Sequence, residues 1–480
     1  MNKRILTTIV STVLAVGAWS QTLTNMQPTS EPLRLPALVR GISVVDDDIY
    51  CFTKDFTLRV SESHGMLSKA EPEKLVTRKG VNYAVRNPET DELYYTHKFG
   101  LFKSKLYAIP YGKDGKGKAL KFEGGKMSVE HPTISENGEY MVFSSKNRKG
   151  QGGKDLYITV NTGQGWSSPE PIAEVNSPGN ETCPNLWQDY LIFASDGHNN
   201  SRGGSDLYAI KIKVKLTHDD SVGYKVEKSY GKLQHLPPPF NSEYNERAAM
   251  VYNGRTYVVR EGDSTSMGDM LTSYNGTPDL VAIYGIVVDG QNHPQPRTQI
   301  TINSNDSRSI ETLTNVEGRY SLFLKKDNFY EIIFGKVSYG VSRQMIETKR
   351  QSEDALIEER SIDVEITSYD PGQYIELQGL FGDDAAVELT KEGREKLSGI
   401  VAFLSGNPAV QVQMTMYCGL ENNKDFNRII AERRSKNLLE YIHAKVPAAK
   451  NITVTNGGAF DTSKNNARVN DLLAIKLGVF

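Results

Sequence analysis

Residues His131–Tyr157 read HPTISENGEYMVFSSKNRKGQGGKDLY, and this stretch decides the fold. Its Ser135–Gly138 segment (SENG) predicts a tight turn, because Asn-Gly readily supplies the positive φ angles of a hairpin. Tyr140–Phe143 is a short β-rich run, typical of a buried strand. A glycine-rich turn follows, and Asp155–Tyr157 begins a second strand. The stretch therefore predicts two neighbouring strands with defined turns.

The stretch is one unit of an internal repeat. Its order of strand, glycine cluster and Asp-Leu-Tyr returns in Cys183–Tyr208, where Tyr208 lies 51 positions after Tyr157. Five leucines mark the same position in successive units: Leu58, Leu106, Leu156, Leu207 and Leu271. A period near fifty with several strands per unit favours a β-propeller, since one small sheet cannot bury both of its faces alone. We expect five blades, with six blades or a single β-sandwich as the alternatives.

The repeat resembles the TolB-type, WD40-like (PD40) propeller repeat. The residues that match are Pro132, Ser135, Asn137, Gly138, Phe143, Ser144, Ser145, Gly153, Asp155 and Tyr157. The resemblance implies an all-β propeller, which we expect over residues 21–276. The last unit is degenerate: Asp269 follows Asp206 by 63 positions, which predicts about twelve inserted residues within Lys211–Leu233.

The repeated Asp155 and Asp206 have two possible roles. They could ligate calcium, but the sequence around them has no run of alternating oxygen ligands. We expect instead that they cap turns through backbone N–H groups, with Tyr157 and Tyr208 as their companions in the structural repeat motif. The eight histidines do not recur at equivalent repeat positions, so we expect no catalytic site, no metal and no cofactor.

Composition limits the function classes. The chain has 480 residues, enough for about three domains. Lys and Arg number 56 against 58 Asp and Glu, and the net charge of -2 gives no reason to expect nucleic-acid binding. Cys51, Cys183 and Cys418 show neither metal-ligand spacing nor a disulfide framework. We expect buried thiols, with a Cys51–Cys183 disulfide as the alternative.

The N-terminal end predicts export. Lys3-Arg4 is basic, Ile5–Val16 is apolar, and Ala18–Ser20 places small residues before Gln21. This order is typical of a signal peptide over residues 1–20, cleaved between Ser20 and Gln21. The apolar run is short for a membrane-spanning helix, and no later run reaches eighteen apolar residues. We therefore expect an exported, soluble mature chain with no transmembrane segment.

Residues 280–348 predict a small β-sandwich. Several short strands with turns between them are expected here, beginning with Val281–Asp289. The motifs Gly285-x-Val287-x-Asp289 and Asn315-x-x-Gly318-x-Tyr320 resemble the carboxypeptidase regulatory-like fold, which is transthyretin-like. No catalytic constellation is visible, so we expect a rigid spacer. The charged segment that follows, residues 349–373, is expected to be a linker, with an exposed sheet edge as the alternative.

Past Gly372 the pattern changes from β to mixed α and β. Thr390 is expected to be the N-cap of a helix, because the apolar residues after it recur at i, i+3, i+4 and i+7. The stripe is Leu397, Ile400, Val401 and Leu404. The elements expected next are a strand at Val410–Met416, a helix at about Asn422–His443, a strand at Ile452–Val454, and a helix or strand in Ala467–Phe480.

This order resembles the OmpA C-terminal-like domain over about residues 374–470, and we expect that domain to occupy residues 374–480. The resemblance rests on Leu389-Thr390-x-Glu392-Gly393, Leu404-x-x-Asn407-Pro408, Asn427 and Glu432-Arg433-Arg434. It implies a peptidoglycan-binding site formed by Asn427, Arg434, Tyr417 and Gly419.

In that family an Asp binds the ammonium of a peptide-stem diamino acid, and an Arg binds its carboxylate. A guanidinium suits a carboxylate because it offers two parallel donors. Here Arg434 is in place, but Gly419 stands where the family has the Asp. We therefore expect weakened binding; the acidic residues that could substitute are Glu421, Asp383 and Asp384.

The order of propeller, sandwich and OmpA-like domain resembles a class of Bacteroidetes envelope proteins that includes a PorE-like component of the type IX secretion system. The resemblance implies a non-catalytic periplasmic scaffold associated with the outer membrane. We expect its propeller to bind envelope or secretion-system proteins and its last domain to contact peptidoglycan. The alternative is a carbohydrate-binding or hydrolytic protein with its site in the propeller channel.

Overall fold

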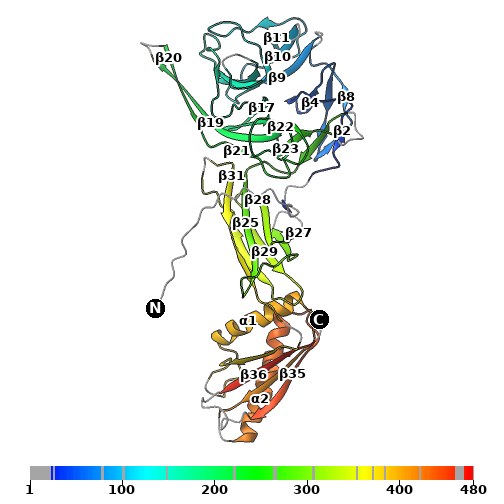
Figure 1. Cartoon of the computed structure of the whole chain (residues 1–480), viewed down its shortest axis with the longest axis vertical. Coiled ribbons are helices and arrows are strands. Elements are labelled where there is room, and N and C mark those ends of the chain that lie inside the picture. Colours follow the sequence, from blue (N-terminus) through cyan, green and yellow to red (C-terminus); the bar gives the residue numbers. More distant parts are fainter. Residues whose placement is uncertain are drawn as a thin grey trace.

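The computed structural model describes residues 23–24, 28–76, 80–99, 103–146, 150–219, 223–262, 268–304, 309–352, 355–369, 372–382, 385–420, 423–459 and 470–478. The expected signal peptide and its cleavage site lie outside these residues. Three units follow one another along the long axis of the molecule: a large all-β unit, a β-sandwich and an α+β unit (Figure 1). None of the described helices is long and apolar enough to cross a membrane.

The all-β unit is a propeller. Among the described residues, five antiparallel sheets form its blades, as the repeat count predicted; four of the sheets have four strands, and the sheet of the fourth blade has a fifth strand, β20 (Gly223–Tyr230). The first blade consists of β3 (Gly41–Val45), β4 (Asp48–Phe52), β5 (Thr57–Val60) and β8 (Glu71–Pro72), and the second of β9 (Val81–Asn87), β10 (Glu92–Phe99), β11 (Lys103–Pro110) and β12 (Lys118–Ala119). The third blade consists of β13 (Glu130–Ile134), β14 (Tyr140–Ser145), β15 (Asp155–Val160) and β16 (Glu170–Pro171), and the fourth of β17 (Glu181–Trp187), β18 (Tyr190–Ser195), β19 (Asp206–Asp219) and β21 (Gln234–His235). The fifth blade consists of β22 (Glu246–Tyr252), β23 (Arg255–Arg260), β24 (Met270–Tyr274) and β2 (Leu33–Arg34). A small hairpin, β6 (Glu62–Ser63) and β7 (Met66–Leu67), follows β5.

The fifth blade takes its outer strand from the other end of the propeller sequence. Leu33 pairs with Leu271 and Arg34 with Met270, so the N-terminal segment closes the ring. The adjacent Leu35 is buried, and its N–H donates to the carbonyl of Asp269 at 2.8 Å. The sequence did not predict this closure, because a two-residue strand carries no local signal that identifies its pairing partner.

The Gly-Gly-x-Asp motif of the third and of the fourth blade contacts the blade that follows. The N–H of Gly153 donates to the carbonyl of Gly179 at 2.7 Å, across the junction between the third and fourth blades. At the next junction, a Cβ on Gly203 would lie only 2.0 Å from the carbonyl oxygen of Tyr244. Glycine is therefore required at this position because the two backbones approach too closely for a side chain.

The inserted residues form a long hairpin. β19 continues beyond its blade and pairs with β20 (Gly223–Tyr230), from Ile212 opposite Tyr230 outward. The hairpin leaves the propeller at its edge (Figure 1). Lys228 Nζ lies 2.7 Å from Glu170 Oε2 on β16, which ties the hairpin to the outer strand of the third blade.

The middle unit consists of two packed sheets. One sheet has the order β1 (Leu23–Thr24), β28 (Arg319–Lys325), β25 (Leu280–Asp289) and β31 (Ile357–Ser361), with β32 (Val364–Ile366) also paired to β25. The other has the order β27 (Ile310–Leu313), β26 (Gln299–Ser304), β29 (Phe329–Gly335) and β30 (Ser342–Glu347). Leu23 and Thr24, which the sequence assigned to the propeller, thus belong to this sandwich.

The expectation that residues 349–373 form a linker is wrong. This segment carries β31 and β32, which pair in parallel with β25, so it is part of the sandwich and β31 forms its edge. Its charges misled the prediction because one of them is compensated inside the protein. Glu358 is buried, and its Oε1 lies 3.3 Å from Lys326 Nζ.

The α+β unit has one mixed sheet and two helices. The sheet order is β33 (Tyr374–Gln378), β36 (Asp471–Leu477), β34 (Val412–Cys418) and β35 (Ile452–Ala459), and the helices are α1 (Lys391–Gly406) and α2 (Lys424–Lys445). Thr390 is the N-cap of α1, as predicted, and its Oγ1 accepts from the N–H of Gly393 at 2.9 Å. The C-terminal segment, left open between helix and strand, is strand β36.

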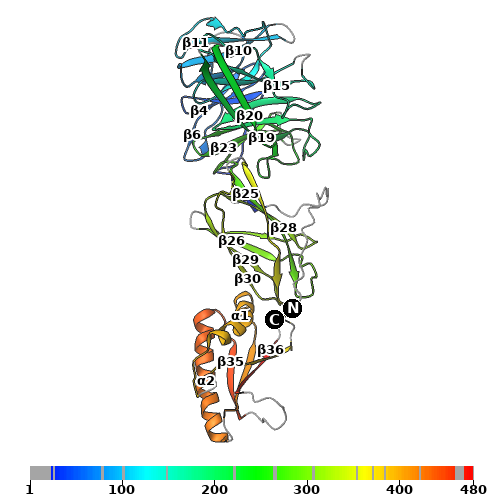
Figure 2. The same ribbon diagram turned by 90° about the vertical axis from the view of Figure 1, so that its left-hand side faces the viewer.

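The three units lie end to end (Figure 2), and direct hydrogen bonds join each unit to the next. At the first junction, Gln234 donates to the carbonyl of Ile357 at 2.9 Å and accepts from the N–H of Leu356 at 2.8 Å. At the second, Asn407 donates to the carbonyl of Tyr339 at 2.9 Å and accepts from the N–H of Ser338 at 3.2 Å. In both Gln234 and Asn407, the amide nitrogen and the amide oxygen each bond to a backbone group of the neighbouring unit.

Candidate functional site

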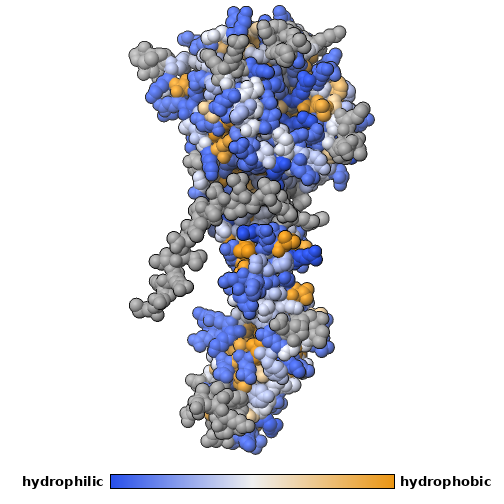
Figure 3. Space-filling view, in the orientation of Figure 1, coloured by the Kyte–Doolittle hydropathy of each residue, from blue (hydrophilic) through white to orange (hydrophobic). Residues whose placement is uncertain are grey.

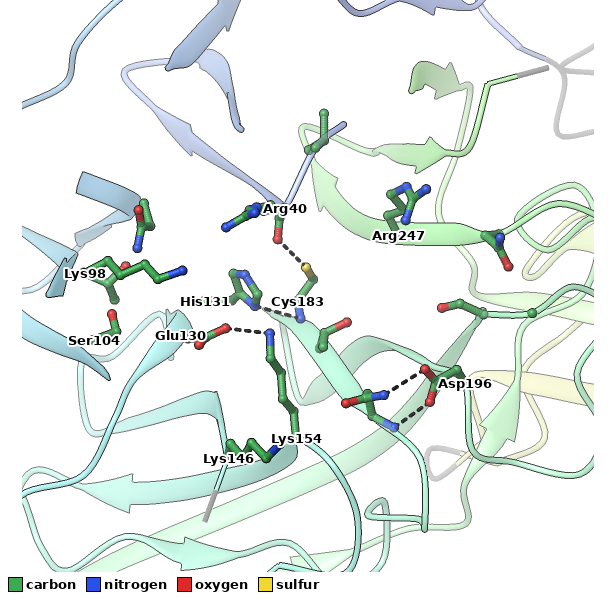
Figure 4. Close-up of a pocket in the computed structure, with 18 residues that line it drawn as sticks. Arg40, Lys98, Ser104, Glu130, His131, Lys146, Lys154, Cys183, Asp196 and Arg247 are labelled. Carbon is green, nitrogen blue, oxygen red and sulfur yellow. Dashed lines mark hydrogen bonds and ion pairs between the residues drawn. The ribbon is translucent and has the colours of Figure 1, made fainter. Parts of the chain in front are cut away.

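The propeller contains a cavity of about 710 Å³ where the inner strands of its blades begin (Figure 4). All five blades contribute to it. Its lining residues are Val39, Arg40, Asn82, Thr96, Lys98, Ser104, Glu130, His131, Lys146, Lys154, Asn180, Thr182, Cys183, Asp196, Gly204, Ser205, Asn245 and Arg247. We call this cavity the propeller mouth.

A β-bulge at the start of the inner strands shapes the propeller mouth. In four blades the register with the neighbouring strand shifts there, which leaves one or two residues without a partner in the ladder. Asn82, His131, Cys183 and Arg247 occupy these bulges. His131 and Cys183 have φ of 50° and each precedes a proline, a residue that bulges tolerate because no ladder N–H is needed.

Positive charge converges on the propeller mouth from four blades. The cations are Arg40, Lys98, Lys146, Lys154 and Arg247, and the carboxylates are Glu130 and Asp196. Lys154 Nζ lies 2.7 Å from Glu130 Oε2, and Arg247 Nε lies 2.9 Å from Asp269 Oδ1. The ion pairs among the described residues do not include Arg40, Lys98 or Lys146.

Three groups in the propeller mouth, Glu130, His131 and Cys183, have shifted pKa values. Burial opposes the charge of Glu130, but nearby Lys154 outweighs this effect and holds the pKa of Glu130 below its usual value. Burial, assisted by Lys154, lowers the pKa of His131 to about 4, so its ring is neutral at pH 7. Burial raises the pKa of Cys183 to about 12, so this thiol stays protonated.

The cysteines are free. Cys51, Cys183 and Cys418 are all buried thiols, so the alternative of a Cys51–Cys183 disulfide is wrong. The Cys183 thiol donates to the carbonyl of Arg40 at 2.9 Å. A buried, protonated thiol is a poor nucleophile, and Cys183 therefore acts as a packing residue in the wall of the propeller mouth.

The repeated aspartates are the first residues of β15 and β19 and are not among the lining residues of the propeller mouth. Asp206 is fully buried and accepts from the N–H groups of Arg202 at 2.5 Å and Gly203 at 3.0 Å. Asp155 is also buried and accepts from the N–H of Gln151 at 2.9 Å. Within the described part of the chain, no group of His, Cys, Asp and Glu side chains has the arrangement of a metal site.

The tyrosines of the repeat motif are core residues. Tyr157 and Tyr208 each stack on the phenylalanine of the strand beside them, with ring centroids 6.2 Å from Phe143 and 5.9 Å from Phe193. Both tyrosines are almost fully buried. The sequence motif therefore joins a turn-capping carboxylate to an aromatic side chain that fills the blade interface.

In the α+β unit, Arg434 is fully buried and bonded to the main chain. Its Nε donates to the carbonyl of Ala386 at 2.8 Å, and its Nη2 to that of Gly382 at 3.2 Å. Its Nη1 lies 3.4 Å from the carbonyl of Asn470, and the guanidinium stands 4.7 Å from the centre of the Phe381 ring. Arg434 thus orders the loops around it.

The structure brings only some of the implied peptidoglycan-binding residues together. The N–H of Gly419 donates to the same Asn470 carbonyl at 3.2 Å, so Gly419 and Arg434 are neighbours, and Asn427 is buried on α2. Tyr417 lies on the opposite face of the sheet, because strand side chains alternate and its neighbour Cys418 packs on α2. The suggested substitutes Glu421, Asp383 and Asp384 lie outside the described residues.

Asp471 is an acidic residue of this region that the motifs did not single out. It is buried and accepts from the N–H groups of Leu380 at 3.1 Å and Phe381 at 3.0 Å. It also pairs with Cys418 across the sheet. Asp471 follows a long polar segment, and no periodic pattern of apolar residues there marks it as a buried acidic residue.

No protein-family model matches the chain, and no curated protein matches it. Among solved structures, a TolB-like protein from Agrobacterium tumefaciens is 10% identical, with 63% of this chain and 92% of that one covered and a TM-score of 0.31. An α-L-arabinofuranosidase from Lactobacillus brevis is 11% identical, with 50% and 92% covered and a TM-score of 0.31. A 3-chlorocatechol 1,2-dioxygenase from Rhodococcus opacus is 11% identical, with 19% and 60% covered and a TM-score of 0.15.

The chain spans between 53% and 60% of the length of three dioxygenases that it matches in structure. The propeller assignment rests on the strand pairing of the five blades and not on these likenesses.

Proposed function

We propose that this chain is a non-catalytic periplasmic scaffold of the bacterial envelope. Its propeller binds a protein partner, its sandwich is a spacer, and its α+β unit contacts peptidoglycan weakly. The resemblance of the repeat to TolB-type propellers and of the domain order to PorE-like envelope proteins supports the setting, including a link to type IX secretion.

The observation that carries the proposal is the pair of fixed junctions. Gln234 and Asn407 each bond to two backbone groups of the neighbouring unit. In the connection from β24 to β25, Asp279 pairs with two residues of the sandwich, Lys326, whose Nζ lies 3.0 Å from Asp279 Oδ1, and Arg350. Such junctions hold a propeller and an α+β unit at opposite ends of a spacer, which is the geometry of a scaffold with two binding ends.

The carboxyl groups of the propeller favour binding over glycoside hydrolysis. A hydrolase needs a carboxylic acid with a raised pKa beside the substrate. The propeller mouth instead contains Glu130, whose pKa is lowered by Lys154 despite its burial. Burial raises the pKa of Glu181 and Glu246, but both are held by serine hydroxyls and neither is among the lining residues.

The α+β unit supports weak contact with the cell wall. Arg434 is the residue that would bind a stem-peptide carboxylate, yet its donors already face carbonyls of Gly382, Ala386 and Asn470. A ligand carboxylate would have to displace at least one of these, and no Asp stands at position 419. Binding should therefore be weaker than a preformed clamp would allow.

The experiment is affinity capture combined with an assay for turnover. The full chain is immobilised and exposed to soluble envelope extract, and the same protein is incubated with chromogenic glycosides. We expect stoichiometric retention of a specific envelope protein and no hydrolysis. Hydrolysis that is lost in Glu130→Gln or Asp196→Asn, or the absence of any retained protein, would contradict the proposal.

A further inference from the structure

The propeller mouth has more positive charge than its own carboxylates neutralise. Glu130 is held by Lys154 at 2.7 Å, and Asp196 accepts from the N–H and the side chain of Asn180 at 2.6 and 2.9 Å. The rim cations Arg40, Lys98 and Lys146 are exposed and take no part in the ion pairs of the described residues. A concave surface with such an excess attracts anions.

Two of these cations face the same part of the cavity. Figure 4 shows the charged ends of Arg40 and Lys98 turned toward the side where His131 lies. They come from different blades, since Arg40 precedes β3 and Lys98 lies on β10. Groups from separate blades can therefore bind one ligand simultaneously.

Ser104 provides an independent sign of a ligand. Its side chain is only 4% exposed, it lines the propeller mouth, and its Oγ has no hydrogen-bond partner among the described residues. It stands directly opposite Lys98 in the β10–β11 register. A buried hydroxyl without a partner costs free energy, which an oxygen of a bound anion would remove.

His131 adds a further donor. Its Nδ1 accepts from the N–H of Cys183 at 3.4 Å, and the ring is neutral at pH 7, so the hydrogen lies on Nε2. The cations, the Ser104 hydroxyl and this ring can all donate to the same kind of ligand. That ligand must present several acceptor oxygens.

The lining favours a peptide over a sugar or a nucleotide. Sugars and bases are usually bound by stacking on aromatic faces, and the described lining has no Phe, Tyr or Trp. It has the amides of Asn82, Asn180 and Asn245, which can bond to a peptide backbone. The propeller surface in Figure 3 is mostly hydrophilic with separate apolar spots, so polar contacts must supply much of the recognition on that face.

We propose that the propeller mouth binds an acidic peptide segment, whose carboxylates are held by Arg40, Lys98 and the Ser104 hydroxyl. The cavity of about 710 Å³ lies within the range of roughly 300–1,000 Å³ typical of ligand sites. The inference rests on the proposed scaffold function and names the chemistry of the partner segment that enters the propeller.

The test measures binding of a rhodamine-labelled hexaglutamate peptide to the full chain by fluorescence anisotropy, with hexaglutamine as the uncharged control. We expect hexaglutamate to bind, with an affinity that falls as salt is raised, and hexaglutamine not to bind. Lys98→Glu should weaken binding on the order of tenfold or more. Lys118→Glu makes the same charge change on the exposed outer strand of the same blade and should leave the affinity unchanged.

Ser104→Ala separates ligand binding from folding. Because the hydroxyl has no described partner in the free protein, its removal should not lower the melting temperature. It should weaken hexaglutamate binding by about 3- to 10-fold. A lowered melting temperature with unchanged affinity would show that Ser104 serves the fold and would overturn its assigned role.

Other outcomes overturn the inference while leaving the scaffold intact. Equal losses of hexaglutamate affinity in Lys98→Glu and Lys118→Glu would mean that the peptide is attracted by the overall charge of the protein and not by the propeller mouth. Binding of a uronate oligosaccharide but not of hexaglutamate would replace the peptide by an acidic glycan. If hexaglutamate fails to bind while an envelope protein is still retained by the immobilised chain, only the acidic-segment inference fails.

Discussion

The carboxylate of Asp206 and the imidazole of His235 form a paired contact inside the fourth blade, with His235 Nε2 2.7 Å from Asp206 Oδ2. Asp206 is fully buried, and burial alone would raise its pKa. The bonds from His235 and from the N–H groups of Arg202 and Gly203 outweigh burial and hold this pKa below its usual value. The carboxylate is thus charged at neutral pH and belongs to the fold.

Asp206→Ala should therefore lower the free energy of unfolding by about 1–3 kcal/mol, because it leaves three donors without their acceptor. Asp155→Ala is the matched variant. It should cost less, since Asp155 accepts one described N–H and its Oδ2 has no described partner. Denaturant melts measure both. Neither calcium nor EDTA should alter the losses, and a calcium-dependent shift abolished by Asp206→Ala would identify a metal ligand instead.

Glu246 should make stability fall as pH rises. Burial raises its pKa to about 7 from an ordinary value of 4.5, despite the bond from Ser242 Oγ at 2.5 Å. Between these two values the folded protein keeps a proton that the unfolded chain has released, so the free energy of unfolding decreases with increasing pH. Glu246→Gln cannot ionise and should lose this slope between pH 4.5 and 7.

The measurement for Glu246 is the difference in melting temperature between wild type and variant across that pH range. The exposed Glu136→Gln serves as the control and should follow wild type. A constant difference between Glu246→Gln and wild type at all pH values would mean that Glu246 does not titrate there.

Leu35 should be essential to the closure of the propeller. It is 4% exposed and packs beside the β2–β24 pair, whereas Leu38, three residues later, is 55% exposed. Leu35→Ala should cost about 2–5 kcal/mol of unfolding free energy. Leu38→Ala should stay within about 0.5 kcal/mol of wild type. Equal costs would show that the N-terminal segment does not pack as the closing strand.

Gly419→Asp should strengthen binding to peptidoglycan. Gly419 is not among the described glycines with positive φ, and its N–H and Arg434 Nη1 donate to the same Asn470 carbonyl. A missing partner for a desolvated ammonium costs roughly 2–5 kcal/mol. Wild type should therefore sediment poorly with purified peptidoglycan, and the variant should sediment better.

Arg434→Lys in the Gly419→Asp background should remove that gain, because an ammonium cannot replace the planar guanidinium. Arg433→Lys changes the exposed neighbour in the same way and should preserve it. Tight wild-type sedimentation that ignores all three substitutions would place the wall-binding site elsewhere.

Features encoded locally could be predicted from the sequence. The five leucines on the third strands of the blades, the inserted hairpin after Lys211 and the N-cap at Thr390 each depend on a few neighbouring residues. Turn residues and hydrophobic period carry such information directly.

Features that depend on distant pairing were missed. The strand Leu33–Arg34 shows its role only beside β24, and β31 reads as a charged linker until Lys326 is placed against Glu358. The burial of Arg434 was missed for the same reason, since motif spacing does not show that loop carbonyls take its donors. The propeller mouth likewise arises from bulges in separate repeats.

The most direct test of the central claim, that the propeller mouth receives a protein partner, is site-specific photo-crosslinking in the native envelope. A photoreactive residue replaces Asn82, which lines the propeller mouth but is not one of the three groups proposed to hold the carboxylates, or Lys118 on the outer strand of the same blade. The account predicts a discrete protein adduct from position 82 and none from position 118. Adducts of equal yield at both positions, or no protein adduct at position 82, would contradict it.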